Sequence, residues 1–400
     1  SCLHQLQLPE RIRSKYKQNP LACTDISWSC NGNLLAVSFG RINHVGWCLE
    51  SGYVAVWNIY DLNTTDQPYV IEVEESYAMR VTFHPTLHNV LTVGTYDGSI
   101  RVYSLQPDTD GDNLLCASQI SSFSHRDAIN SLVWLSHRKD RSKTLLCSMS
   151  GDGKVLLWDT EGTMTQPIAG YSFCYQSKSI PLGGSCLSFT NIHSGTHLAR
   201  KYFSSTEDNF LVGTQIGEVH RAGFSHTSMI EMSSKMNTQP TIRQTPLSFS
   251  YDTSVGFVHS VDASPWDKNV FLTCSSDGFL RFYNVHTKGD LIAVQPSVDQ
   301  QFLYDAKWSP FRPMVFASVS NDGHLFIYDL EQSLSEPVAN IHVNEDSSPL
   351  SIVRFSPKFR EYLVTGDSKG VVKLWQLNDL LSTMQNKELQ KFRLLFQTSS

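Results

Sequence analysis

One short run in the sequence looks like a phosphate-binding loop. Gly151-Asp-Gly-Lys154 combines glycines, which leave the backbone open to a phosphate, with a lysine that could neutralise it. The run lacks the earlier glycine of nucleotide-binding loops and the serine or threonine that opens the following helix. A turn between two strands is the better interpretation. No Gly-x-Gly-x-x-Gly, Gly-x-Ser-x-Gly or His-Glu-x-x-His motif occurs, so the sequence predicts no catalytic residue, no cofactor and no enzymatic activity.

A second group of residues has the chemistry of metal ligands. Cys174, Cys186, His193 and His197 fall within one insertion. Structural zinc sites usually pair cysteines about two to four positions apart, whereas eleven residues separate these two cysteines. An ordinary polar loop is therefore favoured, and no metal site is predicted. The nine cysteines of the chain are irregularly spaced, which is typical of reduced, intracellular thiols.

Basic residues gather at two places without making the chain basic. One run spans 138–143, and a second group at 11–17 precedes the first repeat. Because the net charge is −6, the sequence predicts binding neither to nucleic acid nor to a membrane. The run at 138–143 is interpreted as a solvated turn, whereas 11–17 either contacts an acidic partner or forms a solvated lead-in. No membrane span and no signal peptide is visible.

The elements that carry these residues repeat along the chain. Each repeat has a turn that ends in glycine, then alternating apolar residues, then an aromatic residue five positions after the glycine. The clear copies are Gly52–Trp57, Gly98–Tyr103, Gly153–Trp158, Gly278–Tyr283, Gly323–Tyr328 and Gly370–Trp375, and a seventh, Gly217–Ala222, lacks the aromatic residue. Successive glycines are 46, 55, 64, 61, 45 and 47 residues apart. Three of these spacings approach the ~40–45 residues of a propeller blade, and the longer ones imply loop insertions.

A strand of apolar–x–aromatic pattern precedes each of these glycines and runs into a turn, as at Ile26–Trp28 and Ala306–Trp308. Strands of period two separated by tight turns predict small sheets. A single sheet would expose two apolar faces, and stacking seven around an axis covers both. We therefore expect an all-β, seven-bladed β-propeller over 21–380, after a lead-in at 1–20 and before a tail at 381–400.

Ring closure in a propeller needs one strand from the opposite end of the chain. Two segments could supply it, Leu3–Leu8 and Phe392–Gln397. The C-terminal segment is slightly preferred, so that the tail would provide the closing strand.

The third repeat resembles the WD-repeat family most clearly. It carries His125, Ser131, Asp152 and Trp158, and the resemblance implies that these side chains bond to one another across the blade. The physical reasoning agrees, because a buried aspartate needs donors for its oxygens. Asp97, Asp277 and Asp322 hold the corresponding turn position in other repeats.

Longer motifs resemble the dynein intermediate chains. They are Asp305–Ala317, Gly256–Pro265 with Asn269–Leu272, and Gly366–Leu377. The blade-one stretch with Phe39, Gly40, Arg41, His44 and Trp47 resembles the intermediate chains of dynein-2, the motor of intraflagellar transport. The resemblance spans nearly the whole chain and is weakest between about 160 and 250. It implies a non-catalytic subunit whose propeller binds the dynein-2 heavy chain, beside a second intermediate chain, with light chains bound by an N-terminal region not present here.

Aromatic and arginine side chains in turns are the candidate partner-binding residues, because such residues dominate interfaces. Trp47, Arg41 and His44 lie in the long blade-one loop. The other candidates, Trp266, Phe311 and Arg312, follow Ser-Pro turns, and each of these side chains either binds a partner or packs against a neighbouring blade. The tryptophans that alternate with strand residues are expected in the core, namely Trp28, Trp134, Trp158, Trp308 and Trp375.

The expected function is thus that of a scaffold in the dynein-2 motor, which supports retrograde transport and cilium assembly. The expected locations are the cytoplasm, the cytoskeleton and the cilium, including axoneme and basal body. Two alternatives remain, an intermediate chain of another dynein and a substrate receptor of a cullin ubiquitin ligase. Many such receptors carry an arginine shortly after the blade strand, and the matching positions here hold none: Tyr60, Gln106, Glu161, His286, Glu331 and Asn378.

Overall fold

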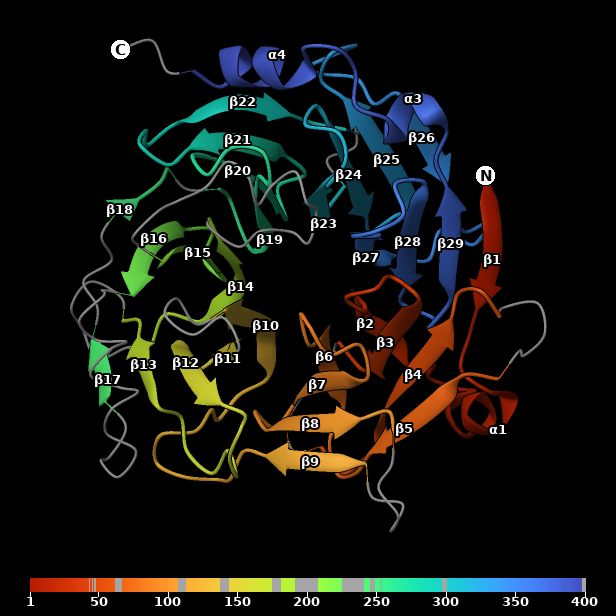
Figure 1. Cartoon of the computed structure of the whole chain (residues 1–400), viewed down its shortest axis with the longest axis vertical. Coiled ribbons are helices and arrows are strands. Elements are labelled where there is room, and N and C mark those ends of the chain that lie inside the picture. The colour runs from red at the N-terminus through yellow and green to blue at the C-terminus, as the bar shows by residue number, and fades with distance from the viewer. Residues whose placement is uncertain are drawn as a thin grey trace. The chain divides into compact units, whose positions relative to one another are not determined.

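The computed structural model describes residues 1–42, 44, 46, 48–61, 67–106, 113–136, 144–174, 181–190, 208–224, 241–244, 249–252, 254–296 and 301–397. They form a seven-bladed β-propeller with a few short helices, which confirms the predicted fold class (Figure 1). The chain divides into two compact units. The first unit comprises Leu8–Ser185 with Phe224–Pro246, and the second comprises Ser1–Gln7, Cys186–Gly223 and Leu247–Ser400.

Three sheets lie in the first unit. In spatial order their strands are β2 (Ala22–Trp28), β3 (Leu34–Gly40), β4 (Gly52–Asn58) and β5 (Tyr69–Val73); β6 (Ala78–Phe83), β7 (Val90–Thr95), β8 (Ile100–Ser104) and β9 (Leu114–Ala117); and β10 (Ile129–Ser136), β11 (Thr144–Ser150), β12 (Lys154–Asp159), β13 (Ala169–Ser172) and β17 (Thr241–Gln244). The helices α1 (Glu10–Arg13) and η1 (Ser14–Tyr16) precede β2. The lead-in predicted at 1–20 is therefore partly helical.

Four sheets lie in the second unit. Their strands are β14 (Gly184–Phe189), β15 (Asp208–Thr214), β16 (Val219–Phe224) and β18 (Phe249–Ser250); β19 (Val258–Ala263), β20 (Val270–Ser275), β21 (Leu280–Asn284) and β22 (Asp290–Val294); β23 (Leu303–Trp308), β24 (Val315–Ser320), β25 (His324–Asp329) and β26 (Ala339–His342); and β27 (Leu350–Phe355), β28 (Tyr362–Asp367), β29 (Val372–Gln376) and β1 (Cys2–Leu6). The helices α3 (Asp379–Ser382) and α4 (Glu388–Leu395) follow β29.

The recurring glycine serves two different purposes. At Gly98, Gly153, Gly217, Gly278, Gly323 and Gly370 it ends a turn between two strands with φ between 76° and 92°, a conformation that side chains other than glycine rarely adopt. Gly52 has no such φ. A Cβ atom at Gly52 would instead come within 2.2 Å of the backbone nitrogen of Ala78 in the next blade. The first copy of the motif therefore keeps its glycine for close packing.

Side chains of one blade satisfy backbone groups on the inner strand of the next. The first strand of each sheet is an edge, and its free N–H groups need acceptors. In the second unit, Asp262 Oδ2 accepts from the Trp308 N–H at 2.9 Å, and Asp305 Oδ2 accepts from the Val353 N–H at 3.2 Å. In the first unit Ser27 does the same for Phe83, with an Oγ···N distance of 3.0 Å. These bonds fix the register between neighbouring blades.

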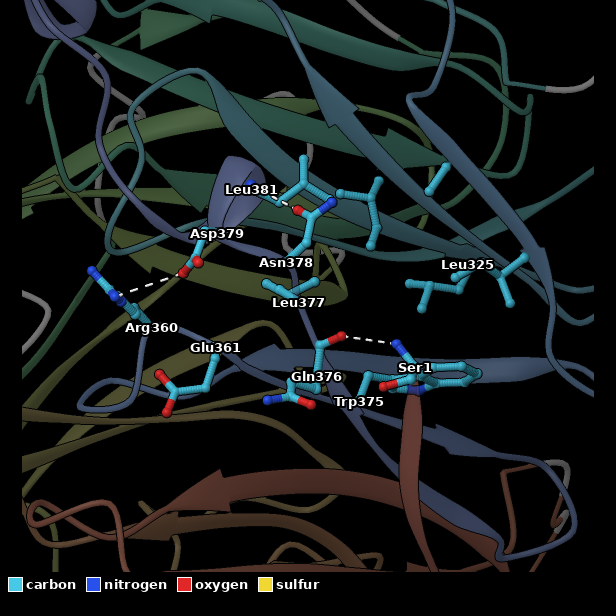
Figure 2. Close-up of a pocket in the computed structure, with 13 residues that line it drawn as sticks. Ser1, Leu325, Arg360, Glu361, Trp375, Gln376, Leu377, Asn378, Asp379 and Leu381 are labelled. Atoms are coloured by element: carbon cyan, nitrogen blue, oxygen red, sulfur yellow. Dashed lines mark hydrogen bonds and ion pairs between the residues drawn. The ribbon is translucent and has the colours of Figure 1, made fainter.

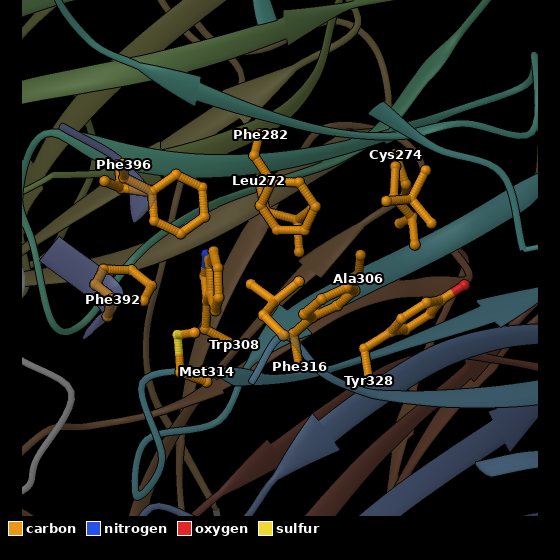
Figure 3. Close-up of a cluster of buried hydrophobic side chains, with 14 of the residues drawn as sticks. Leu272, Cys274, Phe282, Ala306, Trp308, Met314, Phe316, Tyr328, Phe392 and Phe396 are labelled. Atoms are coloured by element: carbon orange, nitrogen blue, oxygen red, sulfur yellow. The ribbon is translucent and has the colours of Figure 1, made fainter. Parts of the chain in front are cut away.

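Aromatic side chains fill the space between blades. Trp308 and Phe316 of one sheet pack against Phe282 of the preceding one, at ring-centroid distances of 5.5 and 5.1 Å from Phe282 (Figure 3). All the tryptophans expected in the core are buried: Trp28, Trp134, Trp158, Trp308 and Trp375. This part of the sequence prediction is confirmed.

The preference for a C-terminal closing strand is wrong. The strand that pairs with β29 is β1, with Leu6 opposite Val372, so the beginning of the chain completes the last sheet (Figure 1). Residues 388–395 form α4 instead. The reason is the spacing of buried residues: Phe392 and Phe396 are buried four positions apart, whereas Leu394 between them is 67% exposed. That pattern has the period of a helix, since a strand would place all three on one face.

Candidate partner-binding surfaces

A hydrogen-bonded chain crosses the third blade, as the WD-repeat resemblance implies, but with a different serine. Trp158 Nε1 donates to Ser148 Oγ at 2.8 Å, and Ser148 Oγ lies 2.7 Å from His125 Nε2. His125 Nδ1 lies 3.2 Å from Asp152 Oδ1. Ser131 stands on β10 opposite Met149, so its assignment to this set is wrong.

The hydrogen-bonded row of side chains is consistent with one assignment of its donors and acceptors. Ser148 accepts from the indole and donates to His125 Nε2, which leaves Nδ1–H to donate to the carboxylate. Burial alone would raise the pKa of Asp152, but the bond from His125 and the nearby charge of Lys154 lower it. The arrangement holds the blade together, and every member has its partners inside the blade.

A spacing in the sequence would have identified the right serine. Ser148 precedes Trp158 by ten positions. The antiparallel pairing of β11 with β12 places Ser148 opposite Leu156, two residues before Trp158. The last blade repeats the spacing, because Trp375 Nε1 donates to Thr365 Oγ1 at 3.0 Å. A hydroxyl ten residues before the tryptophan is thus the signal that was missed.

Two of the predicted partner-binding residues are buried. Trp266 is 8% exposed, and its Nε1 donates to the Ser309 carbonyl at 3.0 Å. Arg312 is 2% exposed, and it binds Asp329 and Glu388. Their role as surface anchors is therefore wrong, because the turns that carry them fold against the neighbouring elements. Phe311 is half-buried at the same turn as Arg312 and remains a candidate.

The long blade-one loop is held by side chains of the second blade. The His44 ring packs edge-on against Tyr77 and Tyr96 at centroid distances of 5.3 and 5.1 Å. Tyr96 Oη donates to the His44 carbonyl at 3.0 Å. Arg41 lies over the Tyr77 ring at 5.8 Å. The structure therefore brings Arg41 and His44 together, whereas Trp47 lies outside the described residues.

Glu50 also helps to hold the blade-one loop against the second blade. It accepts from Tyr77 Oη at 2.6 Å and pairs with Arg41 at 3.4 Å. Burial and the bond to Glu50 raise the pKa of Tyr77, so its hydroxyl stays protonated and able to donate. Two apolar side chains of the loop remain in solvent, Ile42 at 51% and Leu49 at 86% exposure. The loop is thus pinned at its base and presents apolar groups outward.

A surface hollow of about 710 Å³ lies in the second unit, between β25 and β26 on one side and β29 on the other. Its apolar lining includes Leu325, Ile341, Trp375 and Leu381. In Figure 2, Arg360 and Asp379 lie at one end and Leu325 at the other. Among the residues that line it there is no histidine or cysteine. The hollow is suited to binding apolar side chains of another molecule.

No sequence motif pointed to this hollow. Its lining comes from the first residue of the chain, two strands of the sixth sheet, and the segment from Arg360 to Leu381. Residues so distant in sequence carry no common spacing. Only the fold brings them together.

Comparison with known proteins finds similarity to dynein intermediate chains. The chain is 29% identical to the mouse cytoplasmic dynein 2 intermediate chain 2, over 98% of this chain and 71% of that protein. The human protein of the same name is 28% identical over 94% of this chain and 68% of its own length. The chain is a homologue of the dynein intermediate chains. This confirms the resemblance seen in the sequence motifs.

Axonemal dynein subunits are similar too. The mouse dynein axonemal intermediate chain 2 is 26% identical over 91% of this chain, which spans 52% of that protein. No family model matches the sequence. The homology to dynein intermediate chains therefore rests on whole-chain similarity and on the propeller.

The remaining predicted features can be placed within this dynein intermediate chain homologue. Among the described residues, no three histidine, cysteine or acidic side chains gather as a metal site. Cys186 Sγ donates to the Val258 carbonyl at 3.6 Å, whereas His193 and His197 lie outside the described part. The basic run at 138–143 lies outside it as well. No helix in the described ranges is long and apolar enough to cross a membrane.

The lead-in carries its basic residues on the surface. Arg13 pairs with Glu10 at 2.5 Å within α1, and Arg11, Lys15 and Lys17 are exposed. Both interpretations of 11–17 stay open, since exposed basic side chains suit an acidic partner and solvent alike.

Proposed function

We propose that this chain is a non-catalytic intermediate chain of a dynein-2 motor. Its propeller would bind the heavy-chain tail and so support retrograde intraflagellar transport and cilium assembly. The observation that carries the proposal is the similarity to dynein-2 intermediate chains along 98% of the chain. A second intermediate chain, and light chains bound by a region outside this sequence, would complete the assembly. The expected locations are the cytoplasm, the cytoskeleton and the cilium, including axoneme and basal body.

The mechanism would be steric. A rigid propeller offers fixed surfaces, and a stable interface buries about 800 Å² on each partner. Two described surfaces carry apolar side chains that a helical tail could cover, the hollow beside Leu381 and the pinned loop with Leu49.

The experiment is a pull-down of the tagged chain from ciliated cells, read by mass spectrometry. Recovery of the dynein-2 heavy chain supports the proposal. Recovery of an axonemal heavy chain instead would assign the chain to another dynein. That is the second candidate function, because the chain is also similar to an axonemal subunit. Cullin components without any dynein would overturn the proposal.

Surface variants in the same experiment separate the two candidate surfaces. Leu381→Glu changes the hollow and Leu49→Glu changes the loop. Leu87→Glu is the matched control for Leu49→Glu, because Leu87 is 50% exposed on another turn of the first unit. Leu381 is half-buried against the core, so circular dichroism must show that Leu381→Glu folds. Loss of the heavy chain with only one of the first two variants identifies the surface that binds it.

A further inference from the structure

The C-terminal helix α4 is fixed to the propeller by a buried ion pair. Arg312 Nε donates to both carboxylate oxygens of Glu388, at 3.0 and 3.1 Å. The Met314 N–H and the Gln385 N–H donate to the same carboxylate, at 3.1 and 2.7 Å. Glu388 is completely buried. A carboxylate bound by three donor groups holds the first turn of the helix in one position.

Aromatic packing fixes the other end of α4. Phe392 and Phe396 lie 5.6 and 6.3 Å from the Trp308 ring (Figure 3). Asn284 Nδ2 donates to the Phe396 carbonyl at 3.4 Å. Since both ends are held, the same side of the helix always faces solvent.

That outward side is basic with one apolar residue. Lys387, Lys391 and Arg393 are exposed, and Leu394 is 67% exposed. The only carboxylate on the helix is Glu388, whose charge faces Arg312 in the interior. Lys391 already pairs with Glu331 on the neighbouring loop. The exposed charge of α4 is therefore positive, on a chain whose net charge is −6.

We propose that the outward face of α4 docks an acidic segment of a partner protein. An apolar side chain of that segment would cover Leu394, and its carboxylates would face Lys387, Lys391 and Arg393. Charge complementarity selects the sign of the partner, and the exposed leucine supplies apolar area. A nucleic acid is disfavoured, because the exposed leucine would gain no favourable contact with a phosphate backbone. The inference does not rest on the proposed dynein-2 function.

The test places a photo-crosslinking benzoylphenylalanine at position 394 of the full chain in ciliated cells. Crosslinked peptides are then identified by mass spectrometry. The expected product is a protein segment rich in aspartate and glutamate. Crosslinks to neutral or basic segments, to nucleic acid, or to nothing would overturn the proposal.

Charge reversal makes the test specific. Arg393→Glu should lower the crosslink yield by about three- to tenfold, as expected when attraction at one exposed charge becomes repulsion. Lys369→Glu is the matched control, since it reverses an exposed charge that pairs with Asp346 on another turn of the second unit. Equal yields from the two variants would contradict the proposal. Circular dichroism verifies that both variants fold.

Discussion

The hydrogen-bonded chain of the third blade runs from Trp158 through Ser148 and His125 to Asp152. If Ser148 were removed, Asp152 would still accept from the N–H groups of Arg126 and Lys154. Its removal would, however, leave Trp158 Nε1 without an acceptor and His125 Nε2 without its partner. Such groups cost free energy because they lose water and gain nothing in return. Ser148 bonds both Trp158 and His125, so removing its hydroxyl should lower the stability of the fold more than its small size suggests.

We expect Ser148→Ala to lower the free energy of unfolding by about 1–3 kcal/mol, because it orphans both the indole N–H and a ring nitrogen of His125. Ser131→Ala is the control and should change stability by less than about 0.5 kcal/mol. Urea denaturation of both variants measures the difference. Equal losses in the free energy of unfolding for the two variants would show that the hydrogen bonds of Ser148 do not stabilise the fold more than Ser131 does.

His259 gives a residue-scale prediction about pH. Burial lowers its pKa to about 4, against the opposing charge of Asp305, and its Nε2 lies 3.0 Å from Ser276 Oγ. The unfolded chain binds a proton near pH 6.5, whereas the folded chain does so only near 4. The stability contribution is therefore complete above pH 6.5 and is lost as the pH falls toward 4.

His259→Asn removes this titration. We expect the variant to lose less stability between pH 6.5 and pH 4 than the unmodified chain, although other buried histidines still contribute to both. Parallel urea denaturation curves at several pH values make the comparison. Identical pH dependence in the two proteins would contradict the prediction.

At the scale of elements, the ends of the propeller sequence depend on tertiary partners. Within the tail at 381–400, the apolar segment Phe392–Gln397 is long enough for a strand, and the sequence slightly favours it as the closing strand. Phe392 and Phe396 instead pack against Trp308, and Glu388 pairs with Arg312. Neither partner is near in sequence. The helix could therefore not be derived from local pattern alone.

We expect Arg312→Ala to lower the free energy of unfolding by about 3–5 kcal/mol, because two buried carboxylates, Asp329 and Glu388, lose their counter-charge. Limited proteolysis should then cut within α4, which loses its anchor. Arg360→Ala is the control, since Arg360 forms an exposed pair with Asp379 at 3.7 Å and should cost about 0–1 kcal/mol. Protection of α4 in Arg312→Ala would show that aromatic packing alone holds it.

At the scale of the whole molecule, the repeats predicted the number and type of blades correctly because each blade repeats one local pattern. Gly153–Trp158 and Gly278–Tyr283 both form the turn and third strand that their spacing indicates. The fourth blade departs from this rule: β18 has two residues, and β17 within the preceding insertion joins the third sheet in parallel. Insertions carry no repeat pattern, so their pairing is decided by which edges are free.

The candidate surfaces were harder to predict than the fold. Trp266 and Arg312 have the residue types of interface anchors, but burial depends on what folds over them. The Leu394 face follows from the orientation of α4, and the hollow beside Leu381 follows from four separate segments. Sequence alone indicates which residues are able to bind, and the fold decides which of them are exposed.

The pairing of β1 with β29 yields the last prediction. Removing residues 1–6 leaves β29 as an exposed edge strand and uncovers the side chains that pack on Leu6, which is 8% exposed. We expect a loss of about 2–4 kcal/mol in the free energy of unfolding, from lost apolar burial and strand hydrogen bonds. An exposed edge also pairs with other chains, so the truncated protein should self-associate. Urea denaturation and size-exclusion chromatography measure the two effects, with Leu3→Ser as the control because Leu3 is 39% exposed on the same strand. A truncated chain that unfolds at the same urea concentration and stays monomeric would show that the last sheet is stable without β1.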